Sequence, residues 1–299
     1  MRFLNTDGSA PPQLSAVLRW AFVDRLKGAR KPDTRPFSMP RVANDGAALR
    51  ANTAAPWLTW VGHASWLVQI AGQNILIDPV WARAISGVVK RQSEPGVALQ
   101  DLPRIDAVLV THNHRDHMDA FTLKKLASAQ AIVPVGLRSE FRALGFDRVT
   151  ELEWWQSHQV GDVTVHFVPS QHWSKRGLTD TNDSLWGGFV IVGGGVRTYH
   201  SGDTAYFTGF KDIGERLGPI DAAMLPIGAY EPEWFMRQQH MNPEDAVRAF
   251  ADLKARRMLP MHWGTYQLTD EWLGEPPVKL KAIAPDVDLV AIGETVKLA

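Results

Sequence analysis

The segment 111–119 has an unusual density of groups that can bind a metal ion. It reads Thr-His-Asn-His-Arg-Asp-His-Met-Asp and follows directly on an apolar run. Three imidazoles and a carboxylate within six residues are more nitrogen and oxygen ligands than a core or a solvated face needs, so the pattern predicts metal binding. Two adjacent ions can share side chains from one short loop more readily than one ion can use four. We expect one ion to face His112 and His114, and the other to face Asp116 and His117.

Such a site needs further ligands from later parts of the chain. Candidates follow the ends of three later apolar segments, each beside small or turn-forming residues: His172, Asp203 and His262. A lone His or Asp in such a place is usually structural, but the missing ligands and the matching loop positions favour a metal role. Asp203 suits a bridging position, because the two oxygens of a carboxylate can reach two ions about 3.5 to 4 Å apart.

The composition excludes several other chemistries. The 299 residues include 32 basic and 32 acidic side chains and no cysteine. Without cysteine there are no disulfides, thiolate zinc sites, iron–sulfur clusters or thiol nucleophiles, so His and carboxylate must hold any metal. Zero net charge supplies no general field for nucleic acid, and we expect no nucleic-acid partner. No export signal and no apolar stretch near 18 residues is visible, which predicts a cytoplasmic protein.

The elements that must position these residues begin at Trp57, where the pattern becomes β-like. The predicted strands are 58–60, 65–70, 75–78, 105–110, 131–135, 163–168, 188–192, 197–200, one from 220, and 258–261. The predicted helices are 120–129, 137–144, 209–217 and 243–257, the last with Asn242 as its N-cap and Pro243 as its first residue. Residues 103–109 resemble 219–225, which indicates a weak internal duplication. Two sheets made of such halves and covered by helices form an α/β four-layer αββα sandwich, with the site in loops at the strand ends.

We interpret residues 1–56 as an N-terminal extension and 57–299 as the main domain, which carries the candidate metal ligands. The extension has one clearly periodic segment, 14–27, in which apolar residues recur at helical spacing: Leu14, Val17, Leu18, Ala21, Phe22 and Leu26. This amphipathic helix is expected to pack on the main domain, because Asp24 weakens its basic face. Peripheral contact with a membrane stays open as an alternative.

Several short motifs between residues 57 and 280 follow one another in the order in which a known protein family carries them. They are 60–64 (Trp-Val-Gly-His-Ala), 77–79 (Ile-Asp-Pro), 171–173 (Gln-His-Trp), 185–187 (Leu-Trp-Gly), 201–204 (Ser-Gly-Asp-Thr), 226–232 (Pro-Ile-Gly-Ala-Tyr-Glu-Pro), 234–236 (Trp-Phe-Met), 262–265 (His-Trp-Gly-Thr) and 275–280 (Glu-Pro-Pro-Val-Lys-Leu). With the His-x-His-x-Asp-His run, the chain resembles the metallo-β-lactamase superfamily. The segment 226–244 is similar to one branch of it, the N-acylphosphatidylethanolamine-hydrolysing phospholipases D.

The resemblance implies a complete set of metal ligands and a metallo-β-lactamase fold. It places His112, His114 and His172 on one zinc ion and Asp116, His117 and His262 on the other, with Asp203 bridging; other divalent metals could replace the two Zn²⁺ ions. It also implies two catalytic residues, Asp116 and His240. His240 would contact a phosphate or help to protonate a leaving group, and its alternative is a capping or surface role. Asp78 is expected to order the metal loops without binding metal, and the role of His63 stays open.

The implied activity is that of a dinuclear zinc phosphodiesterase. A metal-bound hydroxide would attack N-acylphosphatidylethanolamine-like phospholipids and release a phosphomonoester and an alcohol. The same site could serve a lactonase or a soluble-phosphodiester hydrolase, and a degenerate binding domain is the non-enzyme alternative. A homodimer also stays open. We expect a hydrophobic groove for acyl chains, lined by Trp173, Trp186 and the segment 234–236.

Overall fold

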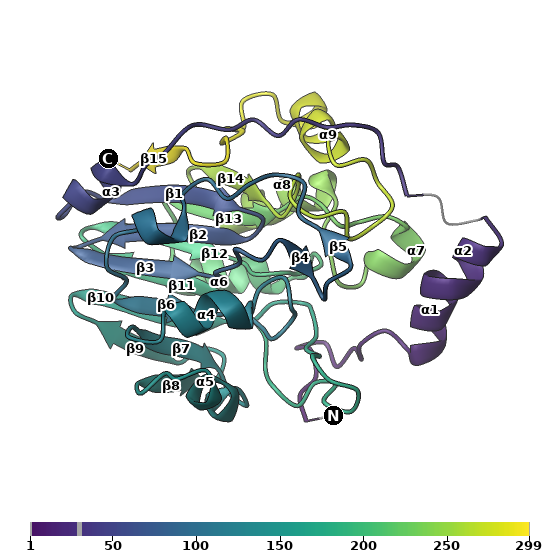
Figure 1. Cartoon of the computed structure of the whole chain (residues 1–299), viewed down its shortest axis with the longest axis horizontal. Coiled ribbons are helices and arrows are strands. Elements are labelled where there is room, and N and C mark those ends of the chain that lie inside the picture. The colour runs from purple at the N-terminus through teal and green to yellow at the C-terminus, as the bar shows by residue number, and fades with distance from the viewer. Residues whose placement is uncertain (1, 29–31, 299) are drawn as a thin grey trace.

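The computed structural model describes residues 2–28 and 32–298, and Figure 1 shows two sheets packed face to face with helices outside. Within these residues the first sheet has the order β15 (Thr295–Lys297), β1 (Trp57–Gly62), β2 (Ser65–Ile70), β3 (Gln73–Ile77), β6 (Ala107–Leu109), β7 (Gln130–Pro134) and β8 (Val149–Leu152). The second has the order β14 (Met258–Met261), β13 (Ala222–Pro226), β12 (Val196–His200), β11 (Gly188–Gly193), β10 (Val163–Val168) and β9 (Ser157–Val160). The predicted αββα sandwich is confirmed.

The helices lie on the outer faces of the sheets and in the loops. They are α3 (Ala47–Ala51), α4 (Ala120–Lys125), α5 (Arg138–Ala143), α6 (Gly209–Leu217), α7 (Glu233–Met236), α8 (Pro243–Leu253) and α9 (Glu275–Ile283), and β4 (Ala84–Ile85) pairs with β5 (Val89–Lys90) apart from the sheets. The predicted helix 209–217 and strand 258–261 have the observed bounds. The helix predicted to reach residue 257 ends at Leu253 instead, because Lys254 takes a left-handed φ of 52°.

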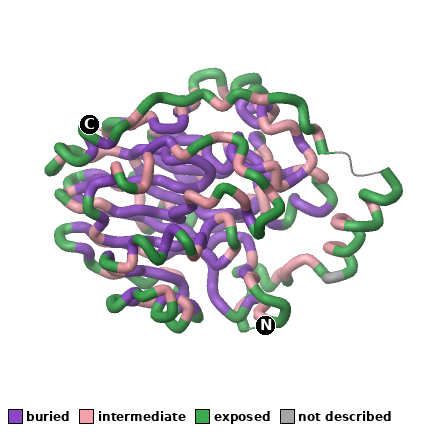
Figure 2. The backbone as a smooth tube through the Cα atoms, viewed as in Figure 1, coloured by how far each residue is buried: buried purple, intermediate pink, exposed green. Residues whose placement is uncertain are grey.

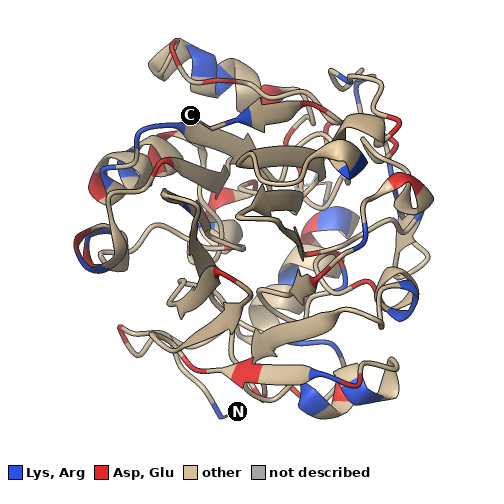
Figure 3. Cartoon of the chain, turned by 90° about the vertical axis from the view of Figure 1, so that its left-hand side faces the viewer, with Lys and Arg blue, Asp and Glu red and all other residues tan. Residues whose placement is uncertain are grey.

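Strand residues alternate between two buried surfaces. In β2, Val68 and Ile70 belong to the core between the sheets, whereas Leu67 packs into a second core with Leu123 of α4 and Phe141 of α5. Because both faces of the central strands are covered, they read as continuous apolar runs rather than as alternating ones. Figure 2 shows that the strands are largely buried. Figure 3 shows that most Lys, Arg, Asp and Glu residues lie on the outer helices and loops.

The internal duplication is visible in the structure. Strands β2, β3, β6 and β7 pair antiparallel, parallel and parallel, and β11, β12, β13 and β14 repeat that pattern. At the same place in each half an aspartate accepts a backbone N–H from the neighbouring hairpin. Asp106 Oδ2 lies 2.9 Å from Asn74 N, and Asp221 Oδ2 lies 2.8 Å from Arg197 N. We call these two contacts the aspartate clasps.

The N-terminal region contacts the sandwich on both sides of a helical segment. Residues 2–9 lie against the loops that follow β10, and Val42 N donates to Ile292 O near the sheet edge. Between these contacts, α1 (Leu14–Leu18), a π-helical turn (Arg19–Val23) and α2 (Asp24–Leu26) confirm the predicted helix and lie at one side of the molecule (Figure 1). Residues 1, 29–31 and 299 and the side chain of Leu14 lie outside the described part. Among the described helices, none has the length and apolar character needed to cross a membrane.

Candidate metal centre

All seven predicted ligands come together at one edge of the sandwich. Four lie in the loop after β6, and His172, Asp203 and His262 follow β10, β12 and β14. These last three strands run in the same direction in the second sheet, so their carboxyl ends meet at one edge. The ligand side chains are buried or nearly so. The fold therefore brings distant parts of the chain to the loop that carries the His-x-His-x-Asp-His run.

Three histidines form the first cluster. His112 Nε2 lies 2.9 Å from His114 Nδ1, and His172 Nε2 lies 3.2 Å from the same His114 atom. Two nitrogens that bind one zinc ion at about 2.0 to 2.1 Å in a tetrahedral site lie roughly 3.3 Å apart. The observed spacing therefore suits three ligands of one ion.

The second cluster combines carboxylates and histidines. Asp116 Oδ2 lies 3.7 Å from His117 Nε2 and 3.6 Å from His262 Nε2. Asp203 reaches both of these histidines, at 3.1 Å from His117 and 3.2 Å from His262. It also lies 4.0 Å from His112 Nε2 and 3.9 Å from His172 Nε2 of the first cluster. Asp203 thus occupies the position between the clusters that a bridging carboxylate would need.

Buried polar atoms without partners indicate that these residues suit metal ions. Within the described structure, no hydrogen bond satisfies Nε2 of His117, Nε2 of His262 or Oδ1 of Asp203. Buried polar atoms are normally paired, and an ion among these three atoms would supply the missing partner. Imidazole and carboxylate are a suitable donor set for zinc and for other divalent transition metals.

The electrostatics differ among the ligands: His112, His114 and Asp203 are held in forms that can bind a cation, whereas His117 and His262 must first release a proton. Burial would lower the pKa of these two rings, but the neighbouring carboxylates, Asp203 first, outweigh it and raise the pKa of His262 to about 9 and that of His117 above its ordinary value. Burial, followed by the neighbouring imidazoles, holds the pKa of His112 well below its ordinary value, and burial lowers the pKa of His114 to about 4. Burial would raise the pKa of Asp203, but the charges of His117 and His262 outweigh it and hold this pKa well below its ordinary value. Neutral imidazoles and ionised carboxylates are the forms that bind metal.

Asp78 and His63 each contact the side chain of a predicted metal ligand. Asp78 Oδ2 lies 2.7 Å from His117 Nδ1 and accepts a hydrogen bond from Thr111 Oγ1, while Oδ1 accepts one from Thr111 N. These contacts order the loop 111–117, as expected of Asp78. The sequence did not decide the role of His63. The Nε2 atom of His63 lies 3.0 Å from Asp116 Oδ2, so this ring lies beside a predicted ligand.

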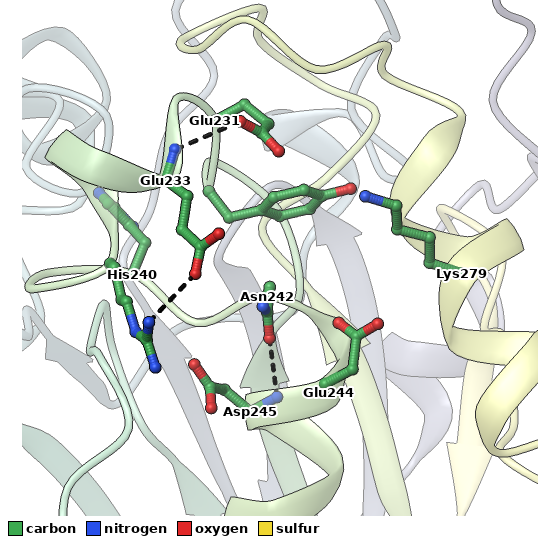
Figure 4. Close-up of a pocket in the computed structure, with 9 residues that line it drawn as sticks. Glu231, Glu233, His240, Asn242, Glu244, Asp245 and Lys279 are labelled. Carbon is green, nitrogen blue, oxygen red and sulfur yellow. Dashed lines mark hydrogen bonds and ion pairs between the residues drawn. The ribbon is translucent and has the colours of Figure 1, made fainter.

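His240 lies between the clusters and a pocket. Its Nδ1 is 4.0 Å from Asp203 Oδ2, and its ring centroid is 5.2 Å from that of His172. Figure 4 shows the pocket, whose volume is about 150 Å³ and whose lining is mainly charged: Tyr230, Glu231, Glu233, Arg237, His240, Asn242, Glu244, Asp245 and Lys279. The side chain of His240 is thus largely buried at the border between the clusters and the pocket, and its contact with a substrate stays a prediction.

The prediction of a hydrophobic groove at this face is wrong. Trp186 is completely buried and donates to Asn5 Oδ1, and Trp173 donates to Gln239 Oε1. Phe235 and Met236 are buried, and only Trp234 of the predicted lining is exposed, at 46%. The tryptophans adjoin the metal loops because their indole N–H groups hold those loops together. The cavity beside His240 is polar instead.

The sequence did not single out Arg176, which contacts the loop 111–119 that carries four of the predicted ligands. We call this loop the first metal loop. The Nη1 atom of Arg176 donates to the backbone oxygens of Asn113 and Met118, at 3.2 and 2.9 Å. Arg176 lies in an irregular loop with no periodic pattern. No signal in the sequence separates it from the other arginines.

Comparisons with known proteins agree with this geometry. The family model described as "Beta-lactamase superfamily domain" matches residues 73–263. A Caenorhabditis elegans protein named N-acyl-phosphatidylethanolamine-hydrolyzing phospholipase D 1 is 41% identical over 244 residues, which cover 75% of this chain and 68% of that protein. The mitochondrial enzyme of that name from Saccharomyces cerevisiae is 36% identical over 239 residues, 76% of this chain and 51% of the yeast protein.

A solved structure extends the agreement to three dimensions. Igni18, a metallo hydrolase from the archaeon Ignicoccus hospitalis, superposes with a TM-score of 0.62 at 25% identity, over 82% of this chain and 99% of that one. The chain therefore belongs to the metallo-β-lactamase superfamily, as a metal-dependent hydrolase related to the N-acylphosphatidylethanolamine-hydrolysing phospholipases D.

Proposed function

We propose that the protein is a dinuclear phosphodiesterase of phospholipase D type, which acts on N-acylphosphatidylethanolamine-like phospholipids. The observation that carries the proposal is the pair of clusters with Asp203 between them. The first cluster is His112, His114 and His172, and the second is Asp116, His117 and His262. The names of the worm and yeast relatives support this substrate class.

The reaction assigns distinct tasks to the residues of the site. Two divalent ions held by the clusters would lower the pKa of a nearby water and offset charge on the phosphate oxygens. Water adds to phosphorus and the bond from phosphorus to the alcohol oxygen breaks, so the products are a phosphomonoester and an alcohol. Asp116 would hold one ion, and His63, whose Nε2 lies 3.0 Å from Asp116 Oδ2, orients the carboxylate. His240 lies where its neutral ring can donate a hydrogen bond to the phosphate or to the leaving oxygen.

Metal analysis and a substrate panel test this proposal. We expect two metal ions per chain, loss of hydrolysis after chelation, and recovery when Zn²⁺ is added. The panel compares N-acylphosphatidylethanolamine with bis-p-nitrophenyl phosphate and with a lactone, because the same centre could serve a lactonase. One metal or none per chain would contradict the dinuclear site. Efficient lactone opening with no turnover of either diester would replace the phosphodiesterase assignment.

Contact with a membrane is part of this proposal. The N-terminal helical segment exposes a set of apolar side chains that does not pack on the domain: Leu18, Phe22, Val23 and Leu26. We call this set the apolar tip. Phe22 is 62% exposed and Leu26 is 88% exposed. Arg25 and Lys27 flank the tip, so its charge complements an anionic bilayer. We accordingly propose a cytoplasmic protein that visits the membrane.

The apolar tip is connected to the site through α7. The ring of Trp20 stacks on Phe235 at 5.2 Å, and the guanidinium of Arg19 lies 4.3 Å from the ring centroid of Trp234. Trp234 and Phe235 precede His240 by a few residues. The expected packing of the helix on the domain is thus limited to one side, and the other side faces outward.

Removing apolar area from the tip should weaken vesicle binding. We expect the double variant Phe22→Ser with Leu26→Ser to bind phosphatidylglycerol-containing vesicles at least roughly tenfold more weakly, because each large apolar side chain contributes about 1.5 to 3 kcal/mol when buried. Vesicle sedimentation measures this, and turnover of bis-p-nitrophenyl phosphate should stay unchanged. The matched control is Leu178→Ser, since Leu178 is 95% exposed elsewhere. Equal losses in both variants, or no loss in either, would contradict a membrane role for the tip.

A further inference from the structure

The first residues of the described chain reach a metal-site loop. The side chain of Asn5 is buried, and its Oδ1 accepts hydrogen bonds from His172 N at 3.1 Å and from Trp186 Nε1 at 3.0 Å. Its Nδ2 donates to Ser9 Oγ at 3.1 Å, which closes a turn in the N-terminal segment itself. One amide side chain therefore joins the N-terminal segment, the loop after β10 and the loop before β11.

Neighbouring contacts hold the same segment on both sides of Asn5. Gln171 Nε2 donates to Asp7 Oδ2 and to Ser9 Oγ, each at 2.9 Å. On the other side, Asn182 O accepts hydrogen bonds from the backbone N–H groups of residues 2 and 3, and Asn182 Nδ2 donates to Phe3 O at 3.1 Å. Residues 2–9 thus form a strap, tied at both ends, with Asn5 buried at its centre.

The strap acts on a residue of the first cluster. His172 Nε2 points to His114 Nδ1 at 3.2 Å, and its Nδ1 lies 2.9 Å from Gln239 O. The backbone of His172 is held by Asn5 and its ring by Gln239, so the two contacts together fix where Nε2 lies. Metal ligands must be held within small tolerances for tight binding, and partners that orient them contribute to affinity.

We propose that Asn5 is a positioning residue for the metal centre, because it fixes the backbone of His172 through the N-terminal strap. The inference rests on the proposed ligand role of His172. Asn5 touches neither substrate nor metal in this assignment. Its effect is to hold His172 Nε2 close to His114 and His112, so that the first cluster is preorganised before an ion arrives.

Two variants of Asn5 separate the acceptor role from simple packing. Asn5→Leu keeps the branched shape of the side chain but removes the acceptor oxygen, whereas Asn5→Asp keeps an oxygen that both donors can reach. We expect Asn5→Leu to lower zinc affinity by about 10- to 100-fold in a competition titration against a chelator. Asn5→Asp should recover most of that affinity. Circular dichroism and melting curves establish that each variant is folded.

A second readout and a control make the result decisive. Hydrogen exchange at the amide of His172 should become faster in Asn5→Leu, also in metal-free protein. Asn52→Leu is the control, because the Asn52 side chain forms its hydrogen bonds within its own turn, with Ala54 and Ala55. Wild-type zinc affinity in Asn5→Leu, or equal losses in Asn5→Leu and Asn52→Leu, would overturn the proposal. These readouts do not use phosphodiester turnover, so a failure of the substrate assignment would leave the result for Asn5 intact.

Discussion

Replacing Asp203 by Ala should lower kcat/KM for a phosphodiester by at least about 10³-fold, the scale of loss seen when a central catalytic group is removed. The carboxylate of Asp203 lies near both clusters, at 3.1 Å from His117 Nε2 and 4.0 Å from His112 Nε2. It also supplies buried negative charge, since its pKa is held well below the ordinary value by His117 and His262 against the effect of burial. Without that charge, two cations would lie close together with less to offset their repulsion.

Elemental analysis should show fewer than two metals per chain in Asp203→Ala, together with the loss of turnover. The control is Asp162→Ala, because Asp162 is exposed in the turn between β9 and β10, away from the clusters. Full metal content and normal turnover in Asp203→Ala would show that this carboxylate is not a bridging ligand.

Replacing His240 by Ala should lower kcat by about 10²-fold while both metals stay bound. The ring lies beside Asp203 and borders the charged pocket, where it can reach a bound phosphate or the leaving oxygen. Positioned groups of this kind contribute roughly 10² to 10⁴ in rate. Burial lowers the pKa of His240 to about 4, so in the free protein near pH 7 its ring is neutral and can donate one hydrogen bond.

The separation of metal content from turnover distinguishes a catalytic role from a ligand role for His240. If His240→Ala loses metal, the residue belongs among the ligands, and if its kinetics match the wild type, it has no part in the reaction. His158→Ala on β9 is the matched control, because this histidine lies on an edge strand of the second sheet. We expect its metal content and kcat to equal those of the wild type.

The fold was predictable where local pattern and burial agree. The apolar runs of β2, β3 and β6 are buried on both faces. Helix α8 begins at Pro243, after the predicted N-cap Asn242, whose side chain accepts the N–H of Asp245. The short helices α3 and α7 were not predicted, because they have too few turns for a 3.6-residue period to appear. Their positions depend on tertiary contacts.

The candidate site was predictable only in part for a related reason. The first metal loop carries four ligand types side by side, so its sequence is enough to indicate a metal. The polar pocket beside His240 and the buried role of Trp186 depend on which side chains face one another across loops. Asn5 is an extreme case, since it lies 167 positions from His172 in sequence. No local pattern carries such information.

The aspartate clasps have a consequence for the order in which the chain folds. Each clasp joins a hairpin to the next strand over a short stretch of sequence, so either half can form these contacts early, at a small entropic cost of loop closure. The metal clusters cannot form so early, because His112 and His262 come from opposite halves. We therefore expect ions to bind only after the halves have docked, which makes their binding free energy part of the stability of the docked state.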